Sequence, residues 1–405
     1  MGVQKVRLDK RHISLLVFVV IAVVTFAAGC GGTTTTAAPG ETGTTTGAAV
    51  TVKIAAQGPF TGDLSKIGLD ALQAVQFAVE DFNKSGAMPG VTFAVEVGDD
   101  IADPATAATV AQKFVEDKAV VGVIGPMNSS TVLSALPVYE EADLAMITQS
   151  ATNDKLAESG WTVFHRICPA DAVQGPSIAK FVTEDLGVKK AFLIDDKSTY
   201  SVGITDSVEA SLAERGVEME RQQIAATDKD FASVLTKVKE FGPDILFTTI
   251  PSPAQAAAIA KQAKSMGIDV TIMGSDGCND PVDFIENAGG ATEGAYATSL
   301  GPLVTDLPTA QDFLDRYIAK YGVTSAFTAQ SYEATMLLLD AIKSVGVQDG
   351  KVDRKAVKEA LGKIQYKGIL DFPVSFLPNG NLATGGIFII QAKGDRFVQV
   401  KGVTL

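Results

Sequence analysis

The stretch KFVEDKAVVGVIGP, residues 113–126, sets the architecture that we expect for this chain. It runs from an amphipathic segment through a short turn into an apolar segment, and it ends on a proline. KVKEFGPDILFTTIP, residues 237–251, repeats that order in the second half of the chain. An amphipathic helix pattern followed by a short buried run indicates an α/β unit with a parallel sheet. Two such units predict two similar lobes with a cleft between them.

Short apolar runs and amphipathic stretches alternate on either side of both segments. Strands are expected at residues 50–56, 91–97, 119–125, 144–148, 190–195, 217–225, 244–250 and 270–274, with a terminal pair around 386–400. Helices are expected at residues 66–83, 105–117, 131–141, 174–186, 203–215, 231–241, 254–266, 310–321 and 329–344. This alternation predicts an α/β fold of two doubly wound lobes joined by a hinge. The expected lobes are residues 50–169 plus 300–378 for lobe 1, and residues 170–299 plus 379–405 for lobe 2.

The N-terminus has the layout of a secretory signal, which we assign to residues 1–30. Four basic residues between Lys5 and Arg11 precede an apolar run at 13–28, which is shorter than the roughly 20 residues that span a bilayer. The run ends in AAGC, which resembles a bacterial lipobox. We therefore expect Cys30 to carry a lipid that anchors the protein to the outer face of the cell membrane. An uncleaved N-terminal anchor is the alternative.

A Thr/Gly-rich segment follows at residues 31–49 and contains no aromatic or large aliphatic side chain. Such a composition cannot bury a core. It predicts a flexible tether between the anchor and the folded part.

Charge and motif content exclude several functions. The chain of 405 residues has a formal net charge of −13, which argues against nucleic acid as a partner. Beyond the signal its one histidine is His165, and the sequence contains no G-x-S-x-G, H-E-x-x-H, Walker A or G-x-G-x-x-G motif. We expect no enzymatic activity, no cofactor and no metal site.

The segment 128–131, Asn-Ser-Ser-Thr, stands where an expected strand gives way to a helix. In an open α/β sheet, ligands bind beyond the carboxyl ends of the strands. The first turn of a helix offers unpaired N–H groups and a positive dipole end, which suit a carboxylate. The alternative is that Ser129 or Ser130 serves only as the helix N-cap.

Further polar residues follow other strands. Ser150 and Thr152 come after the next strand, and Tyr200 and Asp276 stand at corresponding places in the second lobe. Hydroxyl and N–H donors on one lobe therefore face an aromatic ring and a carboxylate on the other. An α-amino acid needs that combination for its carboxylate and its ammonium group. For Asp276 alone, a plain Asp-Gly turn is the alternative.

Cys168 and Cys278 are the cysteines that remain if Cys30 is lipidated. They are able to pair in an oxidising compartment. The sequence does not place them within bonding distance, so the paired and free states both stay open.

Taken in order, the motifs resemble those of the periplasmic leucine/isoleucine/valine-binding proteins, which are two-lobed solute receptors of ABC importers. The motifs are GPFTGDLSKIG (58–68), DDIADP (99–104), IGPMNSSTVLSALPVYEEADLAMITQSAT (124–152), DKSTYSVG (196–203) and MGSDG (273–277). The resemblance covers the chain from about residue 50 to the C-terminus. It implies that Ser129 binds the ligand carboxylate and that Ser150 and Thr152 contact the carboxylate and the ammonium. It also matches Tyr200 to the family's second-lobe tyrosine and Asp276 to its ammonium-binding acid.

The sequence departs from the family in the expected pocket. The best-known members carry tyrosines where Ile67 stands and near Pro251, and a glutamate at the position of Asp276. The positions of their N-lobe disulfide fall near Ala102 and Asn128, and neither is a cysteine here. The ligand therefore need not be leucine.

We expect a monomeric extracytoplasmic lipoprotein that captures an amino acid, branched-chain or similar, between its lobes. It would deliver this ligand to the membrane permease subunits of an ABC transporter. A receptor of the same fold that signals to a membrane partner is the alternative. The lobes should close by bending near residues 168–171, 298–301 and 377–380.

Overall fold

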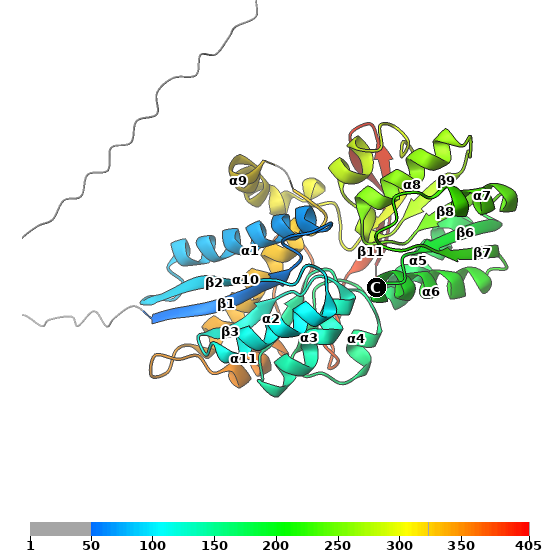
Figure 1. Cartoon of the computed structure of the whole chain (residues 1–405). Helices are drawn as coiled ribbons and strands as arrows, with labels where there is room; N and C mark the ends of the chain where they lie inside the picture. Colours follow the sequence, from blue (N-terminus) through cyan, green and yellow to red (C-terminus); the bar gives the residue numbers. More distant parts are fainter. Residues whose placement is uncertain (1–49, 323, 405) are drawn as a thin grey trace, which may run out of the picture. The chain divides into compact units, whose positions relative to one another are not determined.

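The structure, a computed structural model, describes residues 50–322 and 324–404, in which the chain forms two β-sheets (Figure 1). The first is a parallel sheet with the strand order β2-β1-β3-β4-β5. Its strands are β1 (Val50–Gly58), β2 (Val91–Asp99), β3 (Val120–Ile124), β4 (Met146–Thr148) and β5 (Phe164–Arg166). The part of the chain built on this sheet is called lobe 1 below.

The second sheet has the order β12-β11-β10-β9-β8-β6-β7 and carries lobe 2. Its parallel strands are β6 (Lys190–Asp195), β7 (Glu218–Gln223), β8 (Ile245–Thr248), β9 (Thr271–Gly274) and β10 (Tyr296–Ser299). Two antiparallel strands complete one edge, β11 (Gly386–Lys393) and β12 (Arg396–Thr404). The predicted α/β fold of two doubly wound lobes is confirmed.

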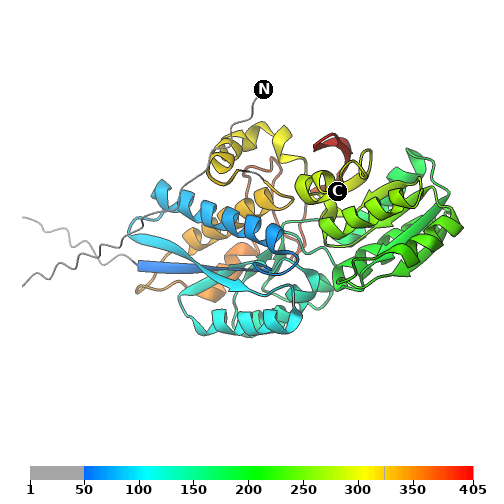
Figure 2. The ribbon, with the colours of Figure 1, turned by 45° about the horizontal axis from the view of Figure 1, so that its top comes forward.

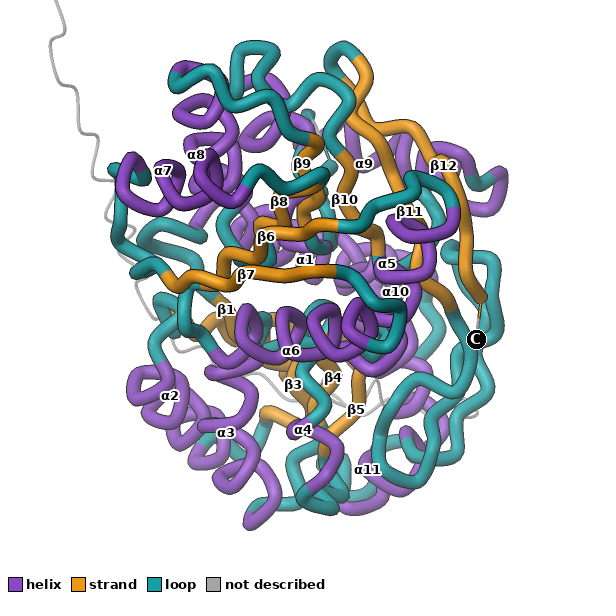
Figure 3. Tube along the Cα trace, turned by 90° about the vertical axis from the view of Figure 1, so that its right-hand side faces the viewer, coloured by secondary structure: helices purple, strands orange, loops and turns teal. Residues whose placement is uncertain are grey.

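Helices cover both faces of each sheet. In lobe 1, α1 (Ser65–Ser85) and α10 (Thr328–Val345) lie on one face, and α2 (Pro104–Glu116) and α3 (Ser129–Glu141) on the other (Figure 2). Lobe 1 also contains α4 (Lys155–Glu158), α9 (Gln311–Tyr321) and α11 (Arg354–Leu361). In lobe 2, α7 (Ala232–Phe241) and α8 (Pro253–Ser265) oppose α5 (Asp171–Glu184) and α6 (Thr199–Ala213) across the strands (Figure 3).

The apolar runs form strands because they are covered on both faces. All five residues of β3 and all four of β8 are buried. Parallel strands between two helix layers are expected to be apolar throughout, in contrast to the alternating pattern of a half-exposed strand. Polar residues follow the carboxyl ends of these strands in the sequence. Residues that follow strands of both sheets line the same pocket.

The expected strands and helices all form, with ends shifted by up to four residues. The largest shift is at α6, which begins at Thr199, four residues before the expected start. There the side chain of Ser198 accepts a hydrogen bond from the backbone N–H of Ser201 at 3.2 Å and caps the helix. The shift matters because it places Tyr200 in the first helical turn. The short helices α4 and α11 and the strands β5 and β10 are not among the elements expected from the sequence.

The chain passes between the two sheets three times within the described residues. The connections are residues 167–170 after β5, residues 300–310 after β10, and residues 377–385 before β11. The first and third lie side by side, since the Arg166 N–H donates to the carbonyl of Gly380 at 3.0 Å. Gly380 has φ +78°, and a Cβ there would lie 1.9 Å from the Phe164 carbonyl oxygen, so only glycine fits. These connections overlap the three places where bending is predicted, the second of them only at residues 300–301.

The predicted signal peptide (1–30), its Cys30 and the predicted tether (31–49) lie outside the described residues. Among the helices that are described, none combines the length and apolar character that a membrane span requires.

Cys168 and Cys278 are free thiols, both buried. The Cys168 Sγ–H donates to the Ala151 carbonyl at 3.5 Å, and the Cys278 Sγ–H donates to the Thr248 carbonyl at 3.7 Å. Burial raises the pKa of each thiol to about 12, so both stay protonated at neutral pH. The two cysteines act as small buried side chains in this structure.

Candidate functional site

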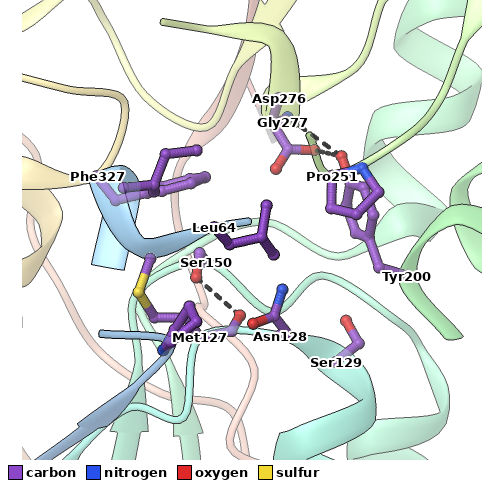
Figure 4. A pocket seen from close by; sticks show the side chains of 12 residues that line it. Leu64, Met127, Asn128, Ser129, Ser150, Tyr200, Pro251, Asp276, Gly277 and Phe327 are labelled. Atoms are coloured by element: carbon purple, nitrogen blue, oxygen red, sulfur yellow. Dashed lines mark hydrogen bonds between the residues drawn. The ribbon is translucent and has the colours of Figure 1, made fainter. Parts of the chain in front are cut away.

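A pocket lies between the polar strand ends of the two lobes and has an empty volume of about 420 Å³ (Figure 4). Its lining comes from both lobes and consists of Pro59, Leu64, Ile67, Met127, Asn128, Ser129, Ser150, Tyr200, Pro251, Asp276, Gly277 and Phe327. Four of the five predicted ligand-binding residues meet here: Ser129, Ser150, Tyr200 and Asp276.

Asp276 provides the charge of the lobe 2 wall. It follows β9 in a single 3₁₀ turn and is only 2% exposed. Its Oδ1 accepts a hydrogen bond from the Tyr200 hydroxyl at 2.7 Å and another from Gln174 Nε2 at 3.0 Å. Gln174 is itself held, because its Oε1 accepts a hydrogen bond from the Thr298 hydroxyl. Protein groups alone therefore hold Asp276 in one orientation.

The Tyr200 hydroxyl is the centre of this small network. Besides Asp276, it lies 2.7 Å from the Ser275 hydroxyl, and it accepts the backbone N–H of Gly277 at 3.3 Å. Tyr200 lies in the first turn of α6, and its hydroxyl group contacts the residues that follow β9. The hydroxyl thus ties the Asp276 turn to the neighbouring helix.

The carboxyl group of Asp276 has no cationic partner among the residues that the structure describes. Burial raises the pKa of Asp276 to about 6, although the hydrogen bonds from Tyr200 and Gln174 act to lower it. None of the lysine or arginine side chains in the described part of the chain forms an ion pair with it. A buried, ionised carboxylate is costly unless a cation is supplied. The site is therefore electrostatically suited to a positively charged group of a ligand.

The lobe 1 wall is formed around the start of α3. Ser129 is the first residue of this helix and is 1% exposed, and its Oγ accepts the Asn153 N–H at a long 3.4 Å. The first four N–H groups of a helix have no partner within it. Together with the Ser129 hydroxyl, they make this end of the pocket rich in donors and favourable for an anion.

Ser150 and Thr152 follow β4 but have different environments. The Ser150 hydroxyl lines the pocket and donates to the Met127 carbonyl at 2.9 Å, so its oxygen remains free to accept from a ligand (Figure 4). Thr152 is fully buried and lies outside the pocket lining. Its carbonyl accepts hydrogen bonds from Arg166 Nη1 at 2.7 Å and from the Asp171 N–H at 2.9 Å. Those bonds fix the loop that carries Ser150.

The rest of the lining is apolar. Ile67 and Pro251, the two positions at or near which the resembled family is expected to carry tyrosines, both lie in it, next to Leu64, Met127 and Phe327. These side chains cannot hydrogen-bond, so they suit a short hydrocarbon part of a ligand.

Sequence reasoning missed Gln174 and Phe327. Gln174 carries a detectable signal, because it is a polar residue on the buried face of α5 and shares that face with Ile178. Phe327 precedes α10, far along the chain from the other lining residues, and no local pattern marks it.

The chain matches the family model described as periplasmic binding protein over residues 51–396. It belongs to this family. The leucine-, isoleucine-, valine-, threonine- and alanine-binding protein of Pseudomonas aeruginosa is 31% identical over 316 residues, which cover 78% of this chain and 83% of that protein. The Leu/Ile/Val-binding protein BraC3 of Rhizobium johnstonii is 28% identical, over 76% of this chain and 85% of that protein.

Solved structures of binding proteins share the architecture. The leucine-binding protein LivK of Thermotoga maritima is 27% identical with a TM-score of 0.79, covering 87% of this chain and 98% of that one. LivJ of Streptococcus pneumoniae, a branched-chain amino acid transporter substrate-binding protein solved with isoleucine, is also 27% identical with a TM-score of 0.79. That match covers 88% of this chain and all of that one. The binding-protein family therefore accounts for the fold of both lobes.

Proposed function

We propose that this binding protein captures a free α-amino acid in the pocket between its lobes and delivers it to an ABC importer. The observation that carries the proposal is the buried Asp276 carboxylate, which has no cationic partner within residues 50–322 and 324–404 and lines the same pocket as a donor-rich helix end. An α-amino acid has a cation and an anion separated by a single carbon, which matches these two ends. The relatives named as leucine-, isoleucine- and valine-binding proteins support this ligand class.

In this proposal each charged end has its own partners. Asp276 and the Ser150 oxygen bind the ammonium group. The Ser129 hydroxyl and the first N–H groups of α3 bind the carboxylate. The side chain of the ligand lies against Ile67 and Phe327.

In this proposal the protein binds and releases its ligand without converting it. None of the pocket-lining residues is a histidine or cysteine able to activate Ser129 or Ser150 as a nucleophile. His165 is 4% exposed in β5, and burial lowers its pKa to about 4. It does not line the pocket.

Closure of the lobes belongs to the same proposal. The pocket needs groups from both lobes, so bending at the three connections would complete the ligand's contacts and exclude water. The predicted lobes, residues 50–169 plus 300–378 and residues 170–299 plus 379–405, would move as units. Small-angle scattering should show a smaller radius of gyration with ligand than without it.

The membrane anchor is proposed from the sequence of the N-terminus. A lipid on Cys30 would hold the protein at the outer face of the cell membrane, close to the permease, with residues 31–49 as the tether. Cys30→Ala should move the protein from the membrane fraction to the medium with its ligand affinity unchanged. A variant that stays in the membrane fraction would indicate an uncleaved anchor.

Two measurements test the binding function. Mass spectrometry of small molecules released from freshly purified, denatured protein should identify an α-amino acid. Calorimetric titration of ligand-stripped protein with individual amino acids should then give saturable binding of the released compound. Saturable binding of no amino acid in a complete set would overturn the proposal.

A further inference from the structure

The Asp276 carboxylate is held by two hydrogen bonds that reach the same oxygen. Its Oδ1 accepts the Tyr200 hydroxyl at 2.7 Å and Gln174 Nε2 at 3.0 Å. No hydrogen bond to Oδ2 forms within residues 50–322 and 324–404, and Figure 4 shows this second oxygen turned away from Tyr200. The bonds to Oδ1 therefore orient the carboxylate, and Oδ2 is the oxygen that a ligand cation can reach.

The two donors differ in what decides their direction. Tyr200 has a single hydroxyl on a rigid ring, placed by the first turn of α6. A glutamine side chain ends in an amide with a donor nitrogen and an acceptor oxygen, which exchange places by rotation about one bond. Gln174 stabilises Asp276 only when its nitrogen faces Oδ1, because the opposite orientation places two acceptor oxygens against each other. The effect of Gln174 thus depends on the group that binds the other end of its amide.

Thr298 is that group. It is fully buried in β10, and its hydroxyl donates to Gln174 Oε1. Gln174 is fully buried as well, in the first turn of α5, so both ends of its amide depend on protein partners. Nε2 is bound to Asp276 and Oε1 to Thr298. Thr298 itself does not line the pocket.

We infer that Thr298 is a positioning residue of the ligand site, because its hydroxyl fixes the Gln174 amide with the nitrogen toward Asp276 and so orients the carboxylate for the ammonium group. This inference rests on the proposed binding of an α-amino acid. Loss of the hydroxyl leaves the buried Oε1 of Gln174 without its partner, which is unfavourable. The amide then turns or withdraws, and Asp276 keeps only the hydrogen bond from Tyr200.

The titratable groups that face Asp276 within the described residues do not supply a positive charge. They are Tyr200 on α6, Cys278 in the same turn, Cys168 in the first connection and Asp171 at the start of α5. Burial raises the pKa of Asp171 to about 8 and the pKa of each thiol to about 12, and it raises the pKa of Tyr200 well above its usual value. All four are therefore mainly neutral at pH 7, and Asp276 depends on its hydrogen bonds.

The first test uses the empty protein, so it does not depend on the ligand. Burial raises the pKa of Asp276 to about 6, and the hydrogen bond from Gln174 acts to lower it. NMR titration of the full-length protein with isotope-labelled aspartate measures this pKa, and Asp276→Asn assigns the signal. Thr298→Val removes the hydroxyl at nearly constant size and should raise the pKa, as Gln174→Leu should. Thr298→Ser keeps a hydroxyl and should give the wild-type value.

The second test measures affinity by titration calorimetry, with the amino acid that the wild type binds most tightly in a complete set. At pH 7.5 Thr298→Val should bind it about tenfold more weakly, because the carboxylate loses a hydrogen bond. Thr292→Val is the matched control. Thr292 is another buried threonine of lobe 2, and its hydroxyl donates to the Phe284 carbonyl at 2.9 Å, outside the pocket lining. The control should keep the wild-type affinity.

A double-mutant cycle shows whether Thr298 acts through Gln174. If it does, Thr298→Val should have no further effect on affinity, or on the pKa of Asp276, in protein that already carries Gln174→Leu. An equal loss in both backgrounds would mean that Thr298 contributes only packing, and it would overturn the inference.

The remaining outcomes separate this inference from the proposed function. Wild-type affinity, or an unchanged pKa of Asp276, in a Thr298→Val variant that circular dichroism shows to be folded overturns the inference, and amino acid binding still stands. If the wild type binds no amino acid, the proposed function is wrong. The titration of the empty protein then still decides whether Thr298 orients Asp276.

Discussion

The two walls of the pocket suit the two charged ends of the proposed ligand through different kinds of group. On lobe 2 a single carboxylate, Asp276, is held by Tyr200 and Gln174 and is almost fully buried. On lobe 1 the donors are neutral and several, and the Ser129 hydroxyl has only one long hydrogen bond. A full charge must be oriented and desolvated at one point, whereas a helix end spreads its positive potential over several N–H groups. Single substitutions should therefore reduce binding more on lobe 2 than on lobe 1.

The largest effect is expected for Asp276→Asn, which keeps the shape and removes the charge. Loss of one member of a desolvated charge pair costs about 2–5 kcal/mol of binding free energy. Calorimetry with the native ligand measures this loss, and Asp244→Asn, in a carboxylate that caps the far end of the lobe 2 sheet, is the control. Wild-type affinity in Asp276→Asn would mean that the ligand has no ammonium group at this position.

The same variant should be more stable than the wild type when empty. Burial raises the pKa of Asp276 from 3.8 to about 6, so the folded state binds the proton more tightly than the unfolded state. The carboxyl therefore costs the wild type stability as the pH rises from about 4 to about 6. At pH 7.5 the ligand-free Asp276→Asn protein should have the higher Tm.

Tyr200→Phe should have the next largest effect, because it removes one of the two hydrogen bonds that orient Asp276. A hydrogen bond to a charged group contributes about 1.5–3 kcal/mol. The pKa of Asp276 should also rise, since that bond stabilises the ionised form. The affinity–pH curve should therefore shift to higher pH. A loss of affinity without this shift would indicate that Tyr200 contributes only packing.

Ser129→Ala tests the other wall and should cost less, about 1.5 kcal/mol. The N–H groups of α3 remain in place and continue to bind the carboxylate. Titration of Ser129→Ala and Asp276→Asn under the same conditions gives the ranking. A greater loss for Ser129→Ala would reverse the comparison of the two walls.

Acidification should weaken binding by about tenfold per pH unit below the pKa of Asp276. Only the ionised carboxylate binds an ammonium group, so the apparent affinity falls with the ionised fraction. Since burial raises the pKa of Asp276 to about 6, affinity should be constant near pH 7.5 and decrease below pH 6. Calorimetry between pH 4.5 and 8 measures the curve, and Asp276→Asn should flatten it.

The smallest effect is expected for Lys66→Met, outside the pocket. Lys66 on α1 of lobe 1 forms an ion pair with Asp280 of lobe 2, with Nζ and Oδ2 at 2.6 Å. The lysine is 36% exposed, and the buried Asp280 keeps the hydrogen bonds that it accepts from the backbone N–H groups of Val282 and Asp283, so the loss of the lysine should cost about 1 kcal/mol of closure. The loss should appear as a faster dissociation rate in stopped-flow measurements, and high salt should reduce the difference from the wild type. Equal dissociation rates at low salt would show that the pair does not stabilise the closed form.

Much of the architecture was predictable because it depends on local patterns. The apolar runs that form β3 and β8 can be recognised in the sequence itself. Polar residues follow each of these runs and mark the turn after the strand. The rule that ligands bind beyond the carboxyl ends of parallel strands then selects Ser129, Tyr200 and Asp276. Each of these residues is marked by its position relative to a strand.

What the tertiary structure decided is which polar residues near the strand ends reach the pocket and which stay outside it. Thr152 stands two residues after Ser150, yet the hydrogen bonds of Arg166 and Asp171 keep its loop in the interior, outside the pocket lining. Asn128 has the sequence position of an ordinary helix cap, and its unpaired oxygen is visible only in the folded structure. The spacing of apolar residues determines secondary structure over one or two helical turns. The partners of a buried polar atom are instead set by segments distant in the sequence, which no local pattern specifies.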